Sequence, residues 1–179
     1  MKYLSILLAL LLNHSIATAA PNTIEIIGLV PGVSTKAQVE QADASGFIIG
    51  GYKLLCVPEY IDDVLSKFVC LTGKDMYSID TTAKESFRIA SNVEVYKVLL
   101  AGFTKKFGVP AKIDTSSARN KLGTEFERQT AIWLDKAGNR LLLTSMATKI
   151  DEGALIMESA QNIKKDRAEE TAADQQRKF

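Results

Sequence analysis

The sequence has few of the side chains on which enzyme catalysis most often depends. Its only histidine is His14, which lies in a leader segment that we expect to be removed. A mature chain without imidazole cannot form a Ser-His-Asp or Cys-His arrangement, and most zinc sites are excluded as well. Glycine motifs that cradle phosphate, GxxxxGK and GxGxxG, are also absent. We therefore expect a protein that is not an enzyme and that holds no cofactor or metal.

The chain also lacks an apolar run long enough to span a bilayer, which takes about 20 residues. Its apolar stretch near the start, residues 4–12, follows Lys2 and precedes the small residues Ala17, Thr18 and Ala19. A positive end, a short apolar core and an A-x-A site are typical of a secretory signal peptide. We expect residues 1–19 to be cleaved after Ala19, leaving a periplasmic or secreted protein without a transmembrane segment.

The mature chain is also expected to have no net charge. The leader carries one of the 22 basic residues, Lys2, and none of the 21 acidic ones, so the two signs balance after cleavage. A neutral chain has no strong field to hold nucleic acid or an acidic membrane surface. We therefore expect the partner to be another envelope or secreted protein and not a nucleic acid.

Cysteine is scarce, and the two that occur, Cys56 and Cys70, are far from C-x-x-C spacing. Export would carry them to an oxidising compartment, where an even pair usually forms a disulfide. Both lie in apolar segments that are typical of neighbouring strands. We predict a structural Cys56–Cys70 bridge, because no motif indicates redox activity.

Two helices are indicated by capping signals. Pro31-Gly32 predicts a turn, after which Thr35 and Gln38 form a capping box for a short helix that ends near residue 44. Residues 91–107 predict a longer amphipathic helix that Ser91 caps, with apolar side chains at helical spacing. Gly102 interrupts this helix, and we expect it to permit close packing against a sheet.

Strands account for most of the remaining apolar segments. We predict them at residues 22–27, 47–57, 67–71, 76–79, 130–135, 140–148 and 154–160. A bend is expected at Gly50-Gly51 and a strand end at Pro58, and residues 59–66 are either a loop or a helical turn. Residues 113–129 are polar and predict a long loop. Residues 161–179 are charged and predict a fraying helix or a disordered tail.

The order of these elements favours an α+β protein in which helices cover one face of an antiparallel meander. We predict one domain over residues 20–160, with 28–80 and 91–160 as two candidate tandem modules of one helix and three strands each. The charged tail at 161–179 would lie outside this domain.

Two stretches resemble a known group of small periplasmic modules. The segment 28–39 resembles the L-x-x-G-M-[ST]-x-x-x-V opening of modules grouped with β-lactamase-inhibitor protein and the small lipoprotein of the outer-membrane assembly machine. The Phe-Gly-Val-Pro of residues 107–110, followed by 131–143, is similar to their second half. This chain has Val33 where Met is typical, and it has no lipobox cysteine. The resemblance implies a binding, inhibitory or assembly role, and it transfers no binding residue.

Trp133 lies in an apolar strand, and two interpretations of it stay open. It is either a core residue or, if Ile132 and Leu134 face the helix, an anchor on the open face of the sheet, because neighbours in a strand point to opposite sides. In the second case Arg119 and Lys121 of the polar loop would flank it. Trp and Arg are enriched at binding hot spots, so these three residues are the candidate binding site.

The function that follows is an exported, non-catalytic binding, inhibitory or envelope-assembly accessory protein that acts through an open sheet face. The alternative is a carboxylate-dependent hydrolase of cell wall or glycan, which needs two carboxyl groups about 5–9 Å apart. The adjacent pairs Asp62-Asp63 and Asp151-Glu152 are the candidates for that chemistry.

Overall fold

The computed structural model describes residues 20–43, 47–73, 77–78, 88–89, 91–119, 122–147 and 151–177. The expected signal peptide lies outside these residues, as does Lys121. In chain order the elements are α1 (Lys36–Asp43), β1 (Phe47–Ile49), β2 (Tyr52–Ile61), β3 (Val64–Gly73), β4 (Tyr77–Ser78), β5 (Arg88–Ile89), α2 (Asn92–Phe107), β6 (Lys112–Arg119), β7 (Glu125–Leu134), β8 (Arg140–Thr144), β9 (Glu152–Glu158) and α3 (Ala160–Gln176).

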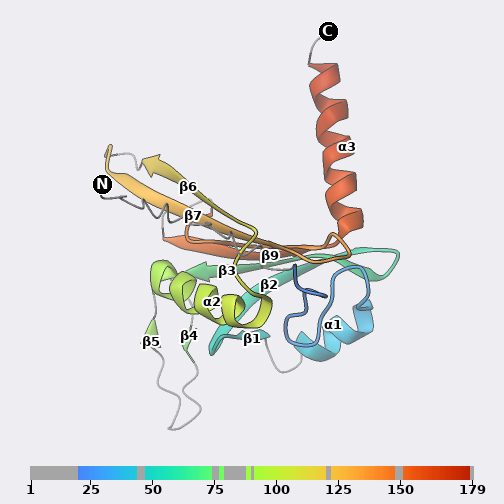
Figure 1. The fold of residues 1–179 in the computed structure, drawn as a ribbon, viewed down its shortest axis with the longest axis horizontal. Helices are drawn as coiled ribbons and strands as arrows, with labels where there is room; N and C mark the ends of the chain where they lie inside the picture. The colour runs from blue at the N-terminus through green and yellow to red at the C-terminus, as the bar shows by residue number, and fades with distance from the viewer. Residues whose placement is uncertain are drawn as a thin grey trace, which may run out of the picture.

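The strands form one antiparallel sheet, and the protein is α+β as predicted. Hydrogen-bonded neighbours follow the order β5-β4-β2-β3-β9-β8-β7-β6, and β1 pairs with β2. The central pairing of β3 with β9 joins the early hairpins of the chain to the late ones, as Figure 1 shows. No strand is described at residues 22–27, where only an isolated bridge joins Ile26 to Leu29.

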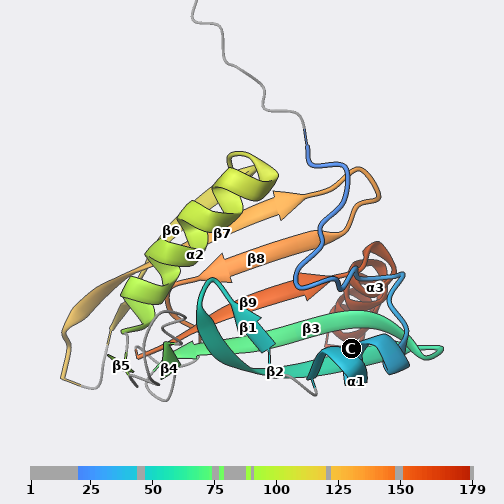
Figure 2. The same cartoon turned by 90° about the horizontal axis from the view of Figure 1, so that it is seen from below.

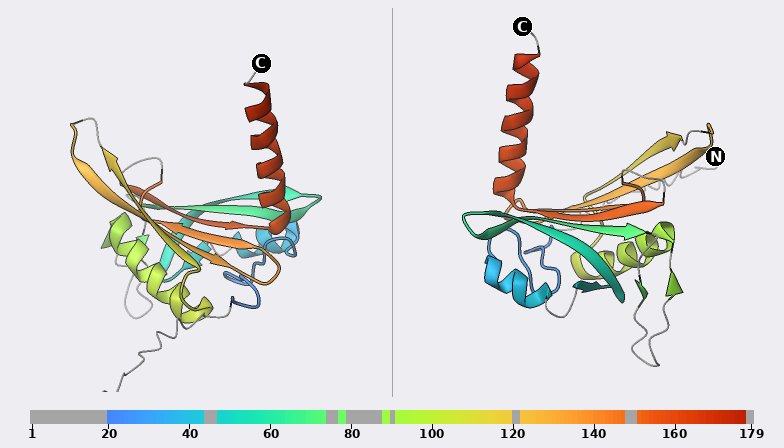
Figure 3. Two further views of the ribbon diagram at one scale, coloured as in Figure 1. Left: turned by 45° about the horizontal axis from the view of Figure 1, so that its top comes forward. Right: turned by 180° about the vertical axis from the view of Figure 1, so that it is seen from behind.

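The helices do not all lie on the same side of the sheet. Helices α1 and α2 cover one face, which we call the covered face (Figure 2). Helix α3 rises from the opposite face and stands away from it over most of its length (Figure 3). The charged tail is a helix over Ala160–Gln176, and Ala160 and Asp166 in its first two turns contact the rest of the protein.

Local capping explains where α1 and α2 begin. The Thr35 N–H donates to Gln38 Oε1 at 2.9 Å, which confirms the predicted capping box. Ser91 Oγ accepts from the Glu94 N–H at 3.2 Å and starts α2 as predicted. Gly102 corrects our expectation, because it faces solvent and a Cβ there would meet no atom within 4 Å.

The first half of the chain forms tighter hairpins than its sequence indicates. Gly50-Gly51 makes a two-residue turn with φ of +59° and +82°, which glycine adopts freely. Asp62-Asp63 makes a second two-residue turn between β2 and β3, so the loop or helical turn expected at 59–66 is wrong. Pro58 does not end its strand. At Pro58, β2 pairs with β3 on one side and with no described strand on the other, so it is an edge strand there. An edge strand tolerates proline, which has no N–H to donate.

The long loop expected at residues 113–129 is also wrong. Strands β6 and β7 pair there over eight registered positions, from Lys112 opposite Ile132 to Arg119 opposite Glu125. Side chains on β6 are exposed on both faces at nearly every position, so no apolar alternation marks the strand. Backbone pairing and polar contacts such as Arg128 Nε to Ser116 Oγ, 3.1 Å, stabilise the hairpin instead.

The core lies between the covered face and the helices. Leu99 and Phe103 of α2 pack on the sheet, and Val39 of α1 is buried with them in one apolar cluster that also includes Ile24 from the segment before α1. The sheet contributes two inward rows, which the strand registers define: Phe68, Met157, Leu141 and Trp133 in one, and Cys70, Leu155, Leu143 and Ala131 in the other.

Candidate binding face

The face of the sheet opposite α1 and α2 is apolar at its centre. The same registers that define the inward rows place the alternate residues on this open side. We give the name apolar face to seven of the aliphatic side chains on this side: Leu55, Val57, Val69, Leu71, Ile132, Leu142 and Ile156. Leu55 is 73% exposed and Val57 is 61% exposed.

A row of alternating charges borders the apolar face on the side where α3 begins. Glu59, Lys67, Glu158 and Arg140 stand opposite one another on β2, β3, β9 and β8. Arg140 Nε donates to Glu158 Oε2 at 2.9 Å, and Lys67 Nζ lies 3.5 Å from Glu158 Oε1. Opposite charges on neighbouring strands stabilise the pairing and set its register.

Glu158 is the buried member of this charged row. Its side chain is 5% exposed, compared with 31% for Arg140 and 24% for Lys67. A carboxylate that is removed from water needs compensating partners, and here two cations supply them. Lys67 also lies 3.8 Å from Asp166 of α3, so the row ties the helix to the sheet.

The base of α3 is fixed by a second set of polar contacts around Asp135. Its carboxylate accepts from the Ile24 N–H at 3.0 Å and from the Asn139 N–H at 2.9 Å. Asn139 Oδ1 in turn accepts from the Ala160 N–H at 3.0 Å, and Ser159 Oγ caps the helix through the Asn162 N–H. These bonds join the N-terminal segment, the β7–β8 turn and α3, so the helix begins at a fixed point on the open side.

A groove runs between this fixed helix and the apolar face. Its volume is about 590 Å³, and residues of β6, β7, the β7–β8 turn, β8 and α3 line it. Ile132, Leu134 and Ile163 make its apolar surface, and Lys164 and Arg167 stand on its α3 side. We call this hollow the α3 groove.

Trp133 does not lie on the open side, which corrects the binding-site prediction. It is 1% exposed, its ring meets Phe103 edge to face with centroids 5.9 Å apart, and its indole N–H donates to the Gly108 carbonyl at 2.9 Å. The facing of its strand is the reverse of the surface interpretation, because Leu134 is 42% exposed and Ile132 lies on the apolar face. Trp133 is a core residue.

The other two residues of that prediction do not flank a tryptophan. Arg119 is an exposed residue at the end of β6, and its Nε lies 3.9 Å from Glu125 Oε1 across the hairpin. Lys121 belongs to the residues that the structure does not describe. The predicted disulfide is present, and it joins Cys56 to Cys70 across β2 and β3.

The two acidic pairs considered for hydrolysis lie at opposite ends of β3. Asp62-Asp63 precede Val64, whereas Glu152 stands opposite Gly73, nine residues further along the strand. At about 3.3 Å per residue the pairs are about 30 Å apart, too far to flank one glycosidic bond. Among the described residues, no group of three or more His, Cys, Asp or Glu side chains is placed to hold a metal ion.

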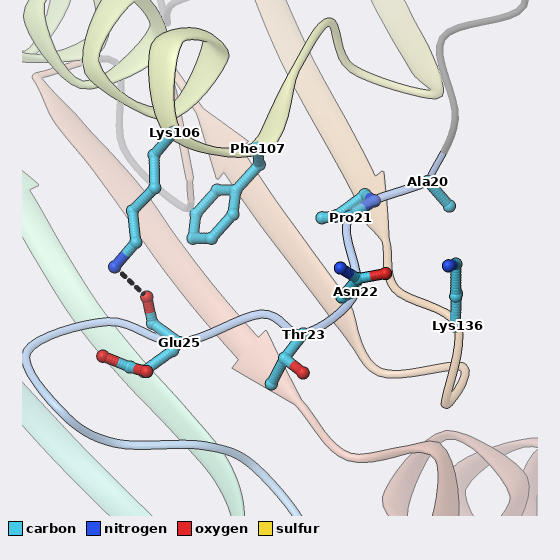
Figure 4. A pocket seen from close by; sticks show the side chains of 8 residues that line it. All are labelled: Ala20, Pro21, Asn22, Thr23, Glu25, Lys106, Phe107 and Lys136. Carbon is cyan, nitrogen blue, oxygen red and sulfur yellow. Dashed lines mark hydrogen bonds between the residues drawn. The ribbon is translucent and has the colours of Figure 1, made fainter.

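A second hollow, of about 520 Å³, lies where the N-terminal segment passes the end of α2 (Figure 4). Lys106 Nζ donates to the Glu25 carbonyl at 2.6 Å and lies 5.3 Å from the centroid of the Phe107 ring. These contacts hold the segment against the helix. They explain the hollow as a structural junction.

Sequence reasoning missed the charged row and the α3 groove. The sequence contains one indication of the charged row, because Glu158 is a single charged residue directly after the apolar run 153–157. Its partners could not be identified, because they depend on the register of three strands. The groove had no signal, because α3 carries no apolar stripe that would place it on the sheet.

The fold and the face define an α+β protein whose antiparallel sheet is covered by helices on one side and apolar on the other. Comparison of the chain with family models, with curated proteins and with solved structures found no match. The resemblance to the periplasmic inhibitor and assembly modules therefore stays a prediction. None of the helices among the described residues is long and apolar enough to cross a membrane.

Proposed function

We propose that this chain is an exported binding or accessory protein that holds another envelope or secreted protein on its apolar face and catalyses no reaction. One observation carries the proposal: the apolar face lies on the open side of the sheet, where Leu55, Val57 and Leu71 are 73%, 61% and 41% exposed, and Figure 1 shows no described helix laid across that side. Contiguous apolar patches on the surface of a protein mark interaction sites.

The pattern of the strands supports this interpretation. An antiparallel sheet with one solvated face normally alternates apolar and polar residues. Here β8 reads Leu141-Leu142-Leu143, and β9 reads Ala154 to Met157 without a polar residue. Such runs are typical of strands that are buried on both faces. The open side therefore has the composition of a surface that a partner covers.

The compartment is part of the proposal. The leader-like segment at residues 1–19 and the Cys56–Cys70 disulfide both agree with an oxidising, extracytoplasmic location. The resemblance of residues 28–39 to periplasmic inhibitor and assembly modules points to the same kind of role.

Site-specific photo-crosslinking tests the proposal in the host's envelope. A photoreactive amino acid at Leu55 or Val57 probes the apolar face, and the same group at Val93 or Val98, exposed aliphatic positions of α2, is the matched control. We expect one protein to crosslink from the apolar face and not from α2. The purified partner should then bind the Val57→Asp variant at least tenfold more weakly than the wild type.

Two outcomes would contradict the proposal. Equal crosslinking from both faces, or none from either, would show that the apolar face has no dedicated partner. Hydrolysis of peptidoglycan by the purified protein that disappears on mutation of Asp62, Asp63, Asp151 or Glu152 would favour the carboxylate hydrolase instead.

A further inference from the structure

The α3 groove combines an apolar floor with cations that have no counter-ion. Arg140 at its edge is paired with Glu158, and Lys112 lies 2.7 Å from Asp114. Within the described part of the chain, by contrast, no ion pair involves Lys164 or Arg167. Both are exposed, and both line the groove. Two positive charges that form no ion pair, beside an apolar surface, favour an anionic, amphipathic occupant.

The height of these two cations above the sheet limits the shape of the occupant. Helix α3 starts at Ala160 and rises from the open side of the sheet (Figure 1). At about 1.5 Å per residue, Lys164 and Arg167 lie about 6 and 10 Å along the helix from that start. A layer packed on a sheet has its axis about 10 Å above it. The cations therefore stand at the level of a helix laid across the apolar face.

An extended peptide fits the groove poorly. Its backbone N–H and C=O groups need partners along a strand edge, and the edge strand β6 reaches the groove only at its first residue, Lys112. The rest of the lining belongs to inner strands, to turns and to α3. A helix satisfies its backbone internally and needs only an apolar stripe to pack on Ile132 and Leu134.

An acyl chain also fits poorly, because sites for small ligands enclose most of the ligand surface. This groove is open: Leu134, on its floor, remains 42% exposed, and Lys164 and Arg167 on its wall are exposed as well.

We propose that the α3 groove takes an amphipathic helix of the partner protein, with acidic residues along the flank that meets α3. This inference rests on the proposed function and adds the secondary structure and charge of the bound segment. Because α3 stands across a helix laid on the apolar face (Figure 1), Lys164 and Arg167 meet the partner helix at one place along its length, and acidic residues clustered there on its flank would match them.

Selection from a peptide library tests the proposal on the purified mature chain. Every 20-residue peptide carries a leucine stripe at helical spacing, and its flanking positions vary among Glu, Lys, Gln and Ala. We expect the wild type to enrich Glu on one flank, and the Lys164→Glu/Arg167→Glu variant to enrich Lys there. A synthesised acidic peptide should bind the charge-reversed variant at least tenfold more weakly, and a central proline in it should abolish binding.

The matched control carries the same change in net charge on the covered side. Lys97→Glu/Lys105→Glu on α2 should select the same peptides as the wild type, with affinity changed less than twofold. Enrichment without preference for Glu, or equal effects of the two double variants, would overturn the inference. So would binding of palmitate or phosphatidylglycerol vesicles with no selected peptide, since the occupant would then be a lipid.

Failure of this inference can be separated from failure of the proposed function. If the crosslinked partner loses affinity for Val57→Asp but binds Lys164→Glu/Arg167→Glu as tightly as the wild type, the apolar face is a binding site and the acidic helix is wrong. If neither variant affects the partner, both proposals fail.

Discussion

Replacing Trp133 by alanine should destabilise the protein strongly. The side chain is 1% exposed, contacts the ring of Phe103 edge to face, and donates its N–H to the Gly108 carbonyl at 2.9 Å. Large-to-small changes of a buried tryptophan cost about 3–5 kcal/mol, because burial is lost and a cavity remains. For a domain of this size each kcal/mol lowers Tm by about 2–4 °C. We therefore expect Tm to fall by about 6–20 °C.

Trp133→Phe separates the hydrogen bond from the volume. Phenylalanine keeps most of the aromatic contact with Phe103 but cannot donate to the Gly108 carbonyl. A lost partner for a part-buried carbonyl costs about 1 kcal/mol, and the smaller ring adds a further cavity term. The phenylalanine variant should therefore lie between the wild type and Trp133→Ala in stability.

Urea unfolding followed by far-UV circular dichroism is the assay, since both variants lack the protein's single tryptophan. Leu134→Ala is the control, because that neighbour faces the open side and its loss should cost less than about 1 kcal/mol. If Trp133→Ala were as stable as the wild type and lost the partner, the indole would be a surface anchor and our assignment of the two faces would be reversed.

Three further perturbations test other parts of the structure. Gly102→Ala should stabilise the protein by about 1 kcal/mol, because the site is helical and exposed with free space around it. Cys56→Ser/Cys70→Ser should lose about 3 kcal/mol, the expectation for a loop of about 15 residues. Burial raises the pKa of the Tyr60 and Tyr96 phenols, so both favour the folded state below pH 10 and lose that contribution as pH rises further. Phenylalanine at both positions should flatten the alkaline loss of stability.

Each of these tests has its own control. Gly50→Ala should destabilise, since φ is +59° there and a Cβ would lie 2.6 Å from Leu99 Cδ2; similar effects at Gly50 and Gly102 would contradict the reasoning. Reductant should lower the stability of the wild type and leave the cysteine double variant unchanged. Stability of the Tyr60→Phe/Tyr96→Phe variant is compared with the wild type at neutral and alkaline pH, and parallel curves would refute the role of the phenols.

The sequence was sufficient to predict α2 because every local signal agrees there. Ser91 caps it, its apolar positions recur at helical spacing, and Gly108 ends it. The Cys56–Cys70 bridge was predictable for a similar reason, since only one pairing is available to two cysteines. The first prediction needed one element with agreeing local signals and the second needed one pair of residues, and both agree with the structure.

The hairpin of β6 and β7 was missed because solvent reaches both of its faces. Alternation of apolar and polar residues reveals a strand only when one of its faces is buried, and nearly every residue of β6 is exposed. The position of α3 could not be predicted either. It has no apolar stripe, and contacts of Asp135 and Asn139 in the β7–β8 turn, together with the Lys67–Asp166 ion pair, decide where it lies.

The most informative incorrect prediction was the one that assigned Ile132 and Leu134 to the covered face. Residues 131–134 read Ala-Ile-Trp-Leu, so alternation assigns neither side to the core. The Trp133 side chain faces α2, where its ring contacts Phe103, so this side of β7 belongs to the core. A chain whose strands alternated cleanly would not have allowed this error, and it would also have had a polar open face. Departures from local consistency tend to occur at functional sites, where a second requirement acts on the same residues. Ile132 and Leu134 are apolar although they do not contribute to the core on the covered face. Their apolar character made the orientation of β7 hard to predict, and it is also what the proposed binding function requires.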